Sequence, residues 1–230
     1  MMVLHLPLKH KEILKVDISD ALNEVRQQLA KVYDPELDQP LTELGFIGGV
    51  DVDGDKVNVR FRLPTYWCAA NFAYMMASDI RDRVSELPWV NQVDVLLQDH
   101  FHDEEINEGM KNGKTFQNAF PDATESLEDL RETFRIKAFQ SRQERVLRWL
   151  KRKGLQEETI LQMRVRDLKE LLKKRQVAKL VERYLNIRQE RGLTDDIDAE
   201  AFTHPDGTPI DTGGLQLLLN KASSTRLSME

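Results

Sequence analysis

The segment that most restricts the fold of this chain is a β-hairpin over residues 46–64. Its sequence is FIGGVDVDGDKVNVRFRLP, and Asp53-Gly54, a dipeptide typical of tight hairpin turns, separates two β-rich runs. After the turn, apolar residues alternate with polar ones, at Val57, Val59, Phe61 and Leu63. A strand with one apolar face needs other elements to cover that face. The hairpin therefore predicts a sheet with one face exposed to solvent and the other face covered by helices.

Amphipathic helices are predicted on both sides of the hairpin. Residues 17–32 and 69–87 both place apolar side chains at spacings of three and four. A turn then leads into a third strand over residues 93–98, which we expect to lie parallel to the strand before the helix. The predicted fold of residues 1–103 is a small two-layer α/β sandwich in the order helix, hairpin, helix, strand.

The rest of the chain has a different composition. Residues 104–123 are polar with two glycines and a proline, which indicates a linker. Residues 124–192 predict an all-α domain with a basic surface, because residues 131–191 hold 19 Lys and Arg against 8 Asp and Glu. Residues 193–230 are turn-rich and predict an extended tail with one short helix.

Several classes of protein are disfavoured by the sequence. A single cysteine cannot form an internal disulfide, so we expect a reducing, cytoplasmic location. No apolar run approaches the roughly 20 residues that cross a bilayer, and the N-terminal residues lack the features of a secretory signal. Because the chain has no glycine-rich phosphate loop, no catalytic triad and no firm metal motif, we predict that it is not an enzyme.

The lone cysteine, Cys68 in PTYWCAANF, has two interpretations. It falls where a predicted strand ends and a helix begins, and the positive end of a helix dipole lowers a thiol pKa and favours the thiolate. A free cysteine is also commonly a small buried apolar residue. The loop YDPELDQPLTELG has two interpretations as well. Asp34 and Glu36 could supply oxygen ligands or orient a thiolate, or Asp34 could simply cap a solvated turn.

Taken together, these segments resemble a known family. The pattern comprises DPE at residues 34–36, Leu-Gly followed by two strands, Thr65 shortly before Cys68, a helix, and an LPWV turn into the last strand. This order is similar to that of the SufT and PaaD-like iron–sulfur cluster assembly factors, also described as metal–sulfur cluster biosynthesis proteins. The resemblance covers about residues 17–102.

The resemblance implies a function in the assembly of iron–sulfur clusters or other metallocentres through protein–protein contact. Cys68 would be the reactive or metal-ligating thiol, and Asp34, Glu36 and Thr65 would shape its site. An iron–sulfur cluster needs about four thiolates, so one cysteine predicts transient binding of a cluster or iron and no stable cofactor. The predicted partners are a client metalloprotein or a cluster carrier, or a second copy in a homodimer. By analogy, the client could be a single metalloenzyme such as a multicomponent monooxygenase.

Two residues depart from the family pattern. Trp67 stands where a small residue is usual, which could narrow access to Cys68. His100 follows the last strand, where it could be a second metal ligand, because imidazole suits iron and zinc. It could equally be an exposed histidine at the end of a strand.

The basic helices leave alternative functions open. Residues 135–154 interleave aromatic and aliphatic residues with many cations, a pattern that fits contact with an acidic protein face or with nucleic acid. Interspersed carboxylates and a pI near 5.5 disfavour nucleic acid. The alternatives are a nucleic-acid-binding regulator that uses these helices and a purely structural adaptor.

Overall fold

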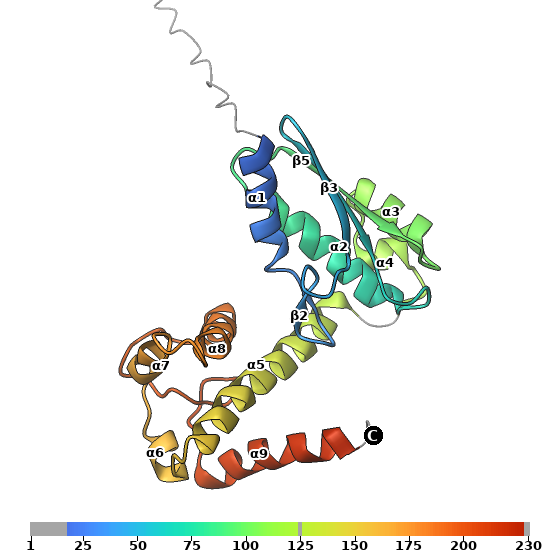
Figure 1. The fold of residues 1–230 in the computed structure, drawn as a ribbon. Helices are drawn as coiled ribbons and strands as arrows, with labels where there is room; N and C mark the ends of the chain where they lie inside the picture. The colour runs from blue at the N-terminus through green and yellow to red at the C-terminus, as the bar shows by residue number, and fades with distance from the viewer. Residues whose placement is uncertain (1–17, 124–125, 228–230) are drawn as a thin grey trace, which may run out of the picture. The chain divides into compact units, whose positions relative to one another are not determined.

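A computed structural model describes residues 18–123 and 126–227 of the chain. The chain divides into two compact units, residues 1–124 and residues 125–230. The first unit combines a sheet with helices and the second is helical, so the predicted fold class is confirmed (Figure 1). No helix of the described residues is both long and apolar enough to cross a membrane. The cytoplasmic location stays a prediction.

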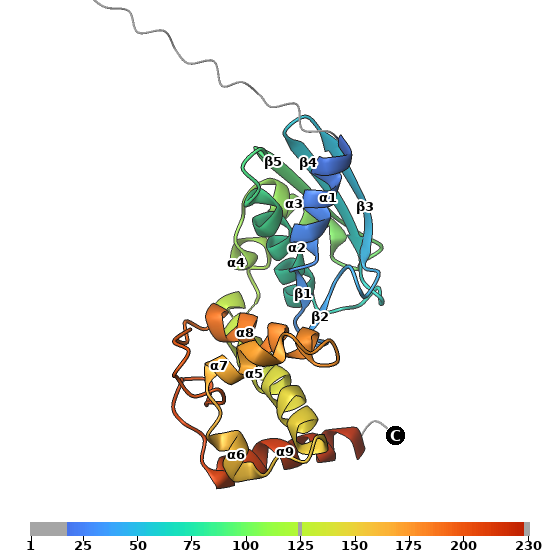
Figure 2. The same cartoon turned by 60° about the vertical axis from the view of Figure 1, so that its left-hand side comes forward.

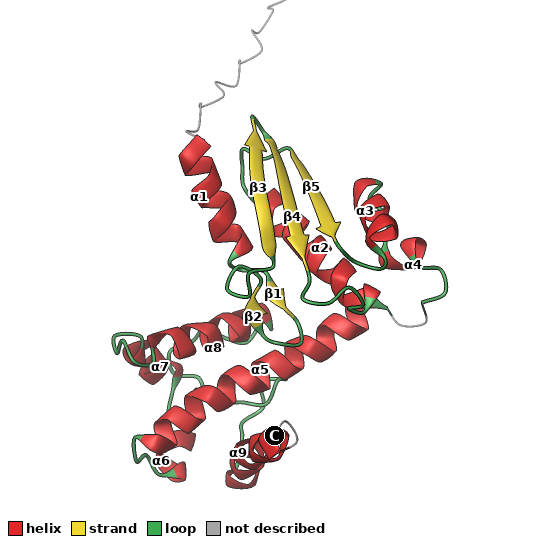
Figure 3. Ribbon diagram, turned by 45° about the vertical axis from the view of Figure 1, so that its right-hand side comes forward, coloured by secondary structure: helices red, strands yellow, loops and turns green. Residues whose placement is uncertain are grey.

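The first unit is built on a three-stranded sheet in the order β3-β4-β5 (Figure 3). Its elements are α1 (Ile18–Leu29), β1 (Tyr33–Asp34), β2 (Gln39–Pro40), β3 (Ile47–Asp53), β4 (Lys56–Arg62), α2 (Ala70–Ser85), β5 (Gln92–Gln98), α3 (Asp103–Lys111) and α4 (Phe116–Ala119). Strand β3 pairs antiparallel with β4, and β4 pairs parallel with β5. The predicted hairpin and the parallel return strand are both confirmed.

The alternation in β4 decides which face of the sheet is covered. Val57, Val59 and Phe61 are fully buried, because α1 packs on β3, α2 packs on β5 and the two helices contact each other. The residues between them point the other way, and Arg60 forms an ion pair with Asp51 across the hairpin at 2.5 Å. The apolar face of the hairpin is thus the core of the unit, and the opposite face meets solvent.

The predicted linker over residues 104–123 is wrong, because this segment folds against the sheet as α3 and α4. Ile106 and Phe116 are buried, and the Tyr74 hydroxyl donates a hydrogen bond to the Lys114 carbonyl. The side chain of Asn107 accepts from the Leu97 N–H at 2.8 Å and donates to the Leu97 carbonyl at 3.0 Å. This amide satisfies backbone groups of the edge strand β5 that would otherwise need another strand.

The second unit consists of α5 (Leu127–Arg152), α6 (Glu157–Leu161), α7 (Val165–Leu171), α8 (Ala178–Glu190) and α9 (Thr212–Leu227). Ser126 caps α5, since its hydroxyl accepts from the Asp129 N–H at 3.1 Å. Helix α8 packs across α5 (Figure 2). Phe139 of α5 and Tyr184 of α8 are fully buried between them, with ring centroids 5.6 Å apart.

The predicted extended tail over residues 193–230 is also wrong in its main part. Ala201 and Phe202 are buried in the helical core, and the Phe202 ring stacks on Tyr184 with centroids 5.8 Å apart. The Ala201 N–H donates to the Met163 carbonyl at 3.0 Å, which fixes the segment beside α7. Because α9 has 16 residues, it is more than the short helix that was expected.

Candidate functional site

Cys68 lies in a tight turn between β4 and α2. Its N–H bonds to the Thr65 carbonyl at 3.4 Å, which closes the turn. Helix α2 begins at Ala70 and has Ala69 as its N-cap, with no side chain capping the helix. Cys68 therefore precedes the cap by one residue, and it is half-buried. Thr65 contributes its carbonyl to the turn, and in the described structure its hydroxyl makes no hydrogen bond.

His100 holds this turn from the end of β5. The preceding residue, Asp99, has a φ of 55° and pairs with Arg62 at 2.7 Å, and this left-handed conformation redirects the chain. The imidazole of His100 is then only 2% exposed. Its Nδ1 accepts from the His102 N–H at 3.1 Å, which leaves the ring proton on Nε2 to donate to the Cys68 carbonyl at 2.8 Å.

This arrangement agrees neither with an exposed histidine at position 100 nor with a metal ligand there. His100 is not an exposed histidine, because its ring is buried. Both of its ring nitrogens are engaged by backbone groups, so neither offers a free lone pair to a metal ion. The structure therefore makes His100 a residue that positions the Cys68 backbone.

The acidic loop before the hairpin faces the same turn. The Asp34 Oδ1 accepts from the Glu36 N–H at 2.9 Å and from the Leu37 N–H at 2.8 Å, so Asp34 does cap a tight turn. Strands β1 and β2 close the loop, with Asp34 opposite Gln39. The charges of Asp34 and Glu36 also act on the Cys68 thiol. Asp34 is therefore the cap of a turn, and its role in shaping the thiol site stays a prediction.

The electrostatics of the turn favour the thiol over the thiolate. Burial raises the pKa of Cys68, and the negative charges of Asp34 and Glu36 raise it further. A hydrogen bond from the Ala69 N–H lowers the pKa, but the net change is upward. The expectation of a thiolate favoured by the α2 N-terminus is therefore wrong, because two carboxylates and partial burial outweigh the helix end.

The carboxylates give a testable pH dependence. Because Cys68 is the only cysteine, alkylation of the whole chain reports on it alone. We expect the midpoint of the pH–rate profile to lie above the ordinary value of 9.0 in the wild type and to fall in Asp34→Asn/Glu36→Gln, since a neutral amide no longer repels the thiolate. Asp53→Asn, in the hairpin turn, is a control that removes a single negative charge and should leave the midpoint unchanged. A midpoint that does not move in the double variant would contradict this electrostatic assignment.

Three exposed aromatic residues surround the cysteine turn, and we call them the aromatic surface: Tyr66, Trp67 and Phe101. Their exposed fractions are 53%, 78% and 63%, respectively. Tyr66 and Phe101 meet edge to face at 6.0 Å, and the Phe101 N–H donates to the Tyr66 carbonyl at 2.9 Å. The sequence suggested only that Trp67 might obstruct the thiol. Sequence reasoning missed the aromatic surface, because Phe101 is distant from Tyr66 in the chain and reaches it only through folding. The available signal was that the segments TYW and HF both carry aromatic residues.

The described residues contain no group of three or more His, Cys, Asp or Glu side chains arranged to hold a metal ion. Cys68 offers one sulfur, with two carboxylates acting on it. An iron–sulfur cluster is held by about four thiolate ligands, so this donor set is incomplete by itself. Such a set suits temporary ligation in which another molecule supplies the remaining donors.

Comparison with known proteins matches a family model to part of the first unit. A family model described as iron–sulfur cluster assembly protein matches residues 22–95. An uncharacterized protein of Methanocaldococcus jannaschii is 34% identical over 90 residues, which are 38% of this chain and 92% of that protein. The family match spans the acidic loop and Cys68, and it ends before His100. The helical unit lies outside the family match.

Proposed function

The α/β unit makes this chain a member of the iron–sulfur cluster assembly protein family, and on that premise we propose that Cys68 briefly ligates iron or an iron–sulfur cluster during its transfer to a client metalloprotein. The observation that carries the proposal is a lone half-buried thiol beside two carboxylates and an exposed aromatic surface. The chain acts by contact with its client or a cluster carrier, as an accessory factor and not as a turnover enzyme.

The carboxylates couple ligation to deprotonation. Without cargo, burial together with Asp34 and Glu36 keeps the Cys68 thiol protonated, so it is a weak nucleophile. A ferrous ion brings positive charge next to the carboxylates, which offsets their repulsion of the thiolate. The iron–sulfur bond then forms as the thiol proton leaves to solvent. Binding is easily reversed because one protein sulfur holds the cargo, and this reversibility suits a transfer step.

The aromatic surface is the contact that we assign to the client or carrier. Trp and Tyr are enriched among residues that dominate binding energy at protein interfaces. A partner that covers Trp67 and Phe101 also covers the Cys68 turn, because Phe101 is bonded to Tyr66 next to it. The charges of Asp34 and Glu36 favour a partner with cations around its cluster-binding cysteines.

Substituting Trp67 tests this contact. Because Trp67 is 78% exposed, Trp67→Ala should leave the fold intact and weaken partner binding roughly tenfold or more. In a strain that lacks the chain, a low level of Trp67→Ala should restore iron–sulfur enzyme activity poorly, and overexpression should rescue it by mass action. Leu96→Ala, at an exposed apolar position of β5, is the control and should restore fully. Full restoration by Trp67→Ala at low expression would exclude Trp67 from the interface.

A deletion strain tests the function itself. Without the chain, we expect enzymes that depend on iron–sulfur clusters to lose activity, while iron enzymes without clusters keep theirs. Loss confined to one metalloenzyme, such as a multicomponent monooxygenase, would identify a dedicated client, and a broad loss would identify a general factor. Unchanged activity of every cluster-dependent enzyme would overturn the proposal.

A further inference from the structure

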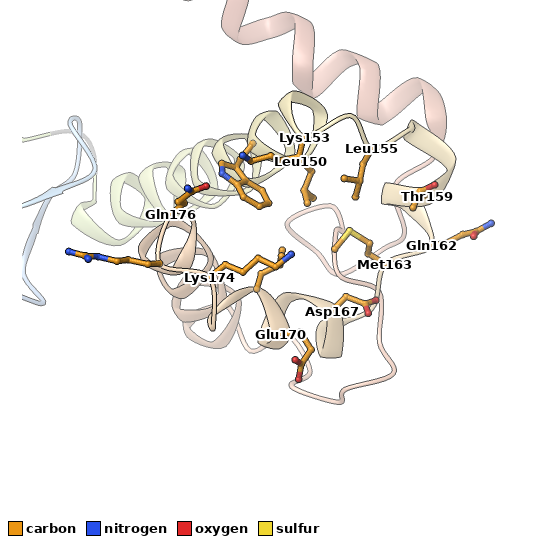
Figure 4. A pocket seen from close by; sticks show the side chains of 13 residues that line it. Leu150, Lys153, Leu155, Thr159, Gln162, Met163, Asp167, Glu170, Lys174 and Gln176 are labelled. Carbon is orange, nitrogen blue, oxygen red and sulfur yellow. The ribbon is translucent and has the colours of Figure 1, made fainter.

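The helical unit contains an open groove that no role described so far uses. It lies between the end of α5, α6 and α7, with a volume of about 960 Å³ (Figure 4). Its floor is apolar and consists of Trp149, Leu150, Leu155, Met163 and Leu171. Leu150 and Leu171 are buried and also belong to the core of the unit, which gives the groove a firm base. In Figure 4, Leu150, Leu155 and Met163 surround one hollow.

The rim of the groove carries positive charge that the protein does not neutralise. Lys153, Lys174 and Arg175 line it and are exposed. Within residues 18–123 and 126–227, none of the three has a carboxylate partner, and the Lys153 Nζ instead lies 5.5 Å from the centre of the Trp149 ring. Figure 4 shows Lys153 above the hollow and Lys174 below it.

The two carboxylates that line the groove are already engaged. The Asp167 Oδ2 accepts from the Arg164 N–H at 2.7 Å at the start of α7. Glu170 forms an ion pair with Lys173 at 2.7 Å. The unneutralised charge beside the apolar floor is therefore positive.

Elsewhere in the unit, carboxylates neutralise part of the positive charge. Several other cations have carboxylate partners within the unit, in the pairs Arg164–Glu200, Lys169–Asp195 and Arg191–Glu132. The rim cations instead stand beside a hollow wide enough for several apolar side chains, since its volume lies in the upper part of the range of about 300–1,000 Å³ for ligand sites. The groove thus combines an apolar floor with free positive charge.

We propose that this groove binds an acidic amphipathic helix of a partner protein. The apolar face of such a helix would enter the floor, where Trp149 offers a broad apolar ring and Met163 adapts to different side chains. Its carboxylates would meet Lys153, Lys174 and Arg175. A protein segment fits better than nucleic acid, because the apolar floor suits leucine side chains and offers nothing to a phosphate backbone. This recognition site is independent of Cys68 and of the function proposed for it.

Fluorescence anisotropy with the full-length chain tests the proposal. The probe is a labelled helical peptide of about 18 residues, or five turns. It has leucine at spacings of i, i+3, i+4 and i+7 along one face and glutamate at all other positions. We expect saturable binding that Lys153→Glu/Lys174→Glu/Arg175→Glu weakens at least about tenfold. The control Lys137→Glu/Arg152→Glu/Lys179→Glu changes the net charge equally, at exposed positions outside the groove lining, and should weaken binding by less than about twofold.

Four results would overturn the proposal. The first is an absence of saturable binding, and the second is an equal loss of affinity in the two triple variants. The third is equal or tighter binding of a peptide with lysine in place of glutamate. The fourth is displacement of the probe by a DNA duplex whose own binding is abolished by the groove variant, which would make the groove a nucleic-acid site. Thermal unfolding of each variant should match the wild type, because the substituted residues are exposed.

Discussion

In a strain that lacks this chain, Cys68→Ser is expected to restore no more iron–sulfur enzyme activity than an empty vector. Serine has nearly the size of cysteine, but its hydroxyl does not ionise near neutral pH and is a poor ligand for iron. Because Cys68 is the only cysteine, no other thiol of the chain can replace it. Overexpression should not rescue this variant, since the defect lies in ligation and not in partner binding.

The same variant must be shown to fold. The contacts that hold the turn come from backbone groups of Thr65 and Cys68 and from the His100 ring, and a serine leaves all of them in place. Thermal unfolding and circular dichroism of Cys68→Ser should therefore match the wild type. Restoration of activity by a well-folded Cys68→Ser would show that the chain works as a structural adaptor and would remove the thiol from the mechanism.

Tyr184→Ala is expected to destabilise the helical unit by about 3–5 kcal/mol, the range for removing a large buried aromatic side chain. Tyr184 is fully buried against Phe139 and Phe202, and its hydroxyl bonds to the Gln143 side chain and, at 3.0 Å, to the Ala201 carbonyl. Burial raises the pKa of Tyr184 to about 12, so the phenol stays neutral and keeps its proton for these bonds at physiological pH. Removing the ring leaves a cavity and also frees the segment around Ala201.

Hydrogen exchange followed by mass spectrometry localises this effect. Amides of α5, α8 and residues 199–203 should exchange faster in Tyr184→Ala, while β4 and α2 keep wild-type protection. Tyr184→Phe is the matched control, because it keeps the ring and removes only the hydroxyl, for an expected loss of about 1–2 kcal/mol. Equal losses in the two variants would show that hydrogen bonding, and not packing, dominates at this position.

The fold of the α/β unit was largely predictable from local pattern. The alternation in β4 and the Asp53-Gly54 turn fix the hairpin, and two amphipathic helices supply the layer that covers it. Parallel pairing of β5 followed from the helix between the strands. These features are encoded within a few residues of each other, so the sequence alone carries them.

The segments that were predicted as linker and tail were wrong for a shared reason. Their few apolar residues look isolated in the sequence, and only the folded chain gives them partners. Ile106 is buried on the side of α3 that packs on β5, and Phe202 stacks on a ring 18 positions earlier in the chain. The pairing of Asn107 with both backbone groups of Leu97 likewise has no local signature. The polar composition of these segments therefore predicted exposed chain, although single apolar residues and one amide fix the segments in the fold.

The candidate site was likewise predictable only in part from the sequence. Cys68, Asp34 and Glu36 were found from the order of motifs, and the structure brings the two carboxylates within electrostatic reach of the thiol. The pKa direction could not be predicted, because it depends on burial and on a loop about 30 residues away. The role of His100 depended on the left-handed turn at Asp99, which buries a ring that the sequence places at a strand end.

The central claim is that Cys68 ligates the cargo, and the most direct measurement is iron binding by the protein itself at equilibrium. Full-length wild type and Cys68→Ser are prepared anaerobically and dialysed to equilibrium in parallel against the same solution of ferrous iron. We predict that the wild-type compartment holds iron in excess of a protein-free control, while the Cys68→Ser compartment does not. Equal excess iron with the two proteins would contradict the account.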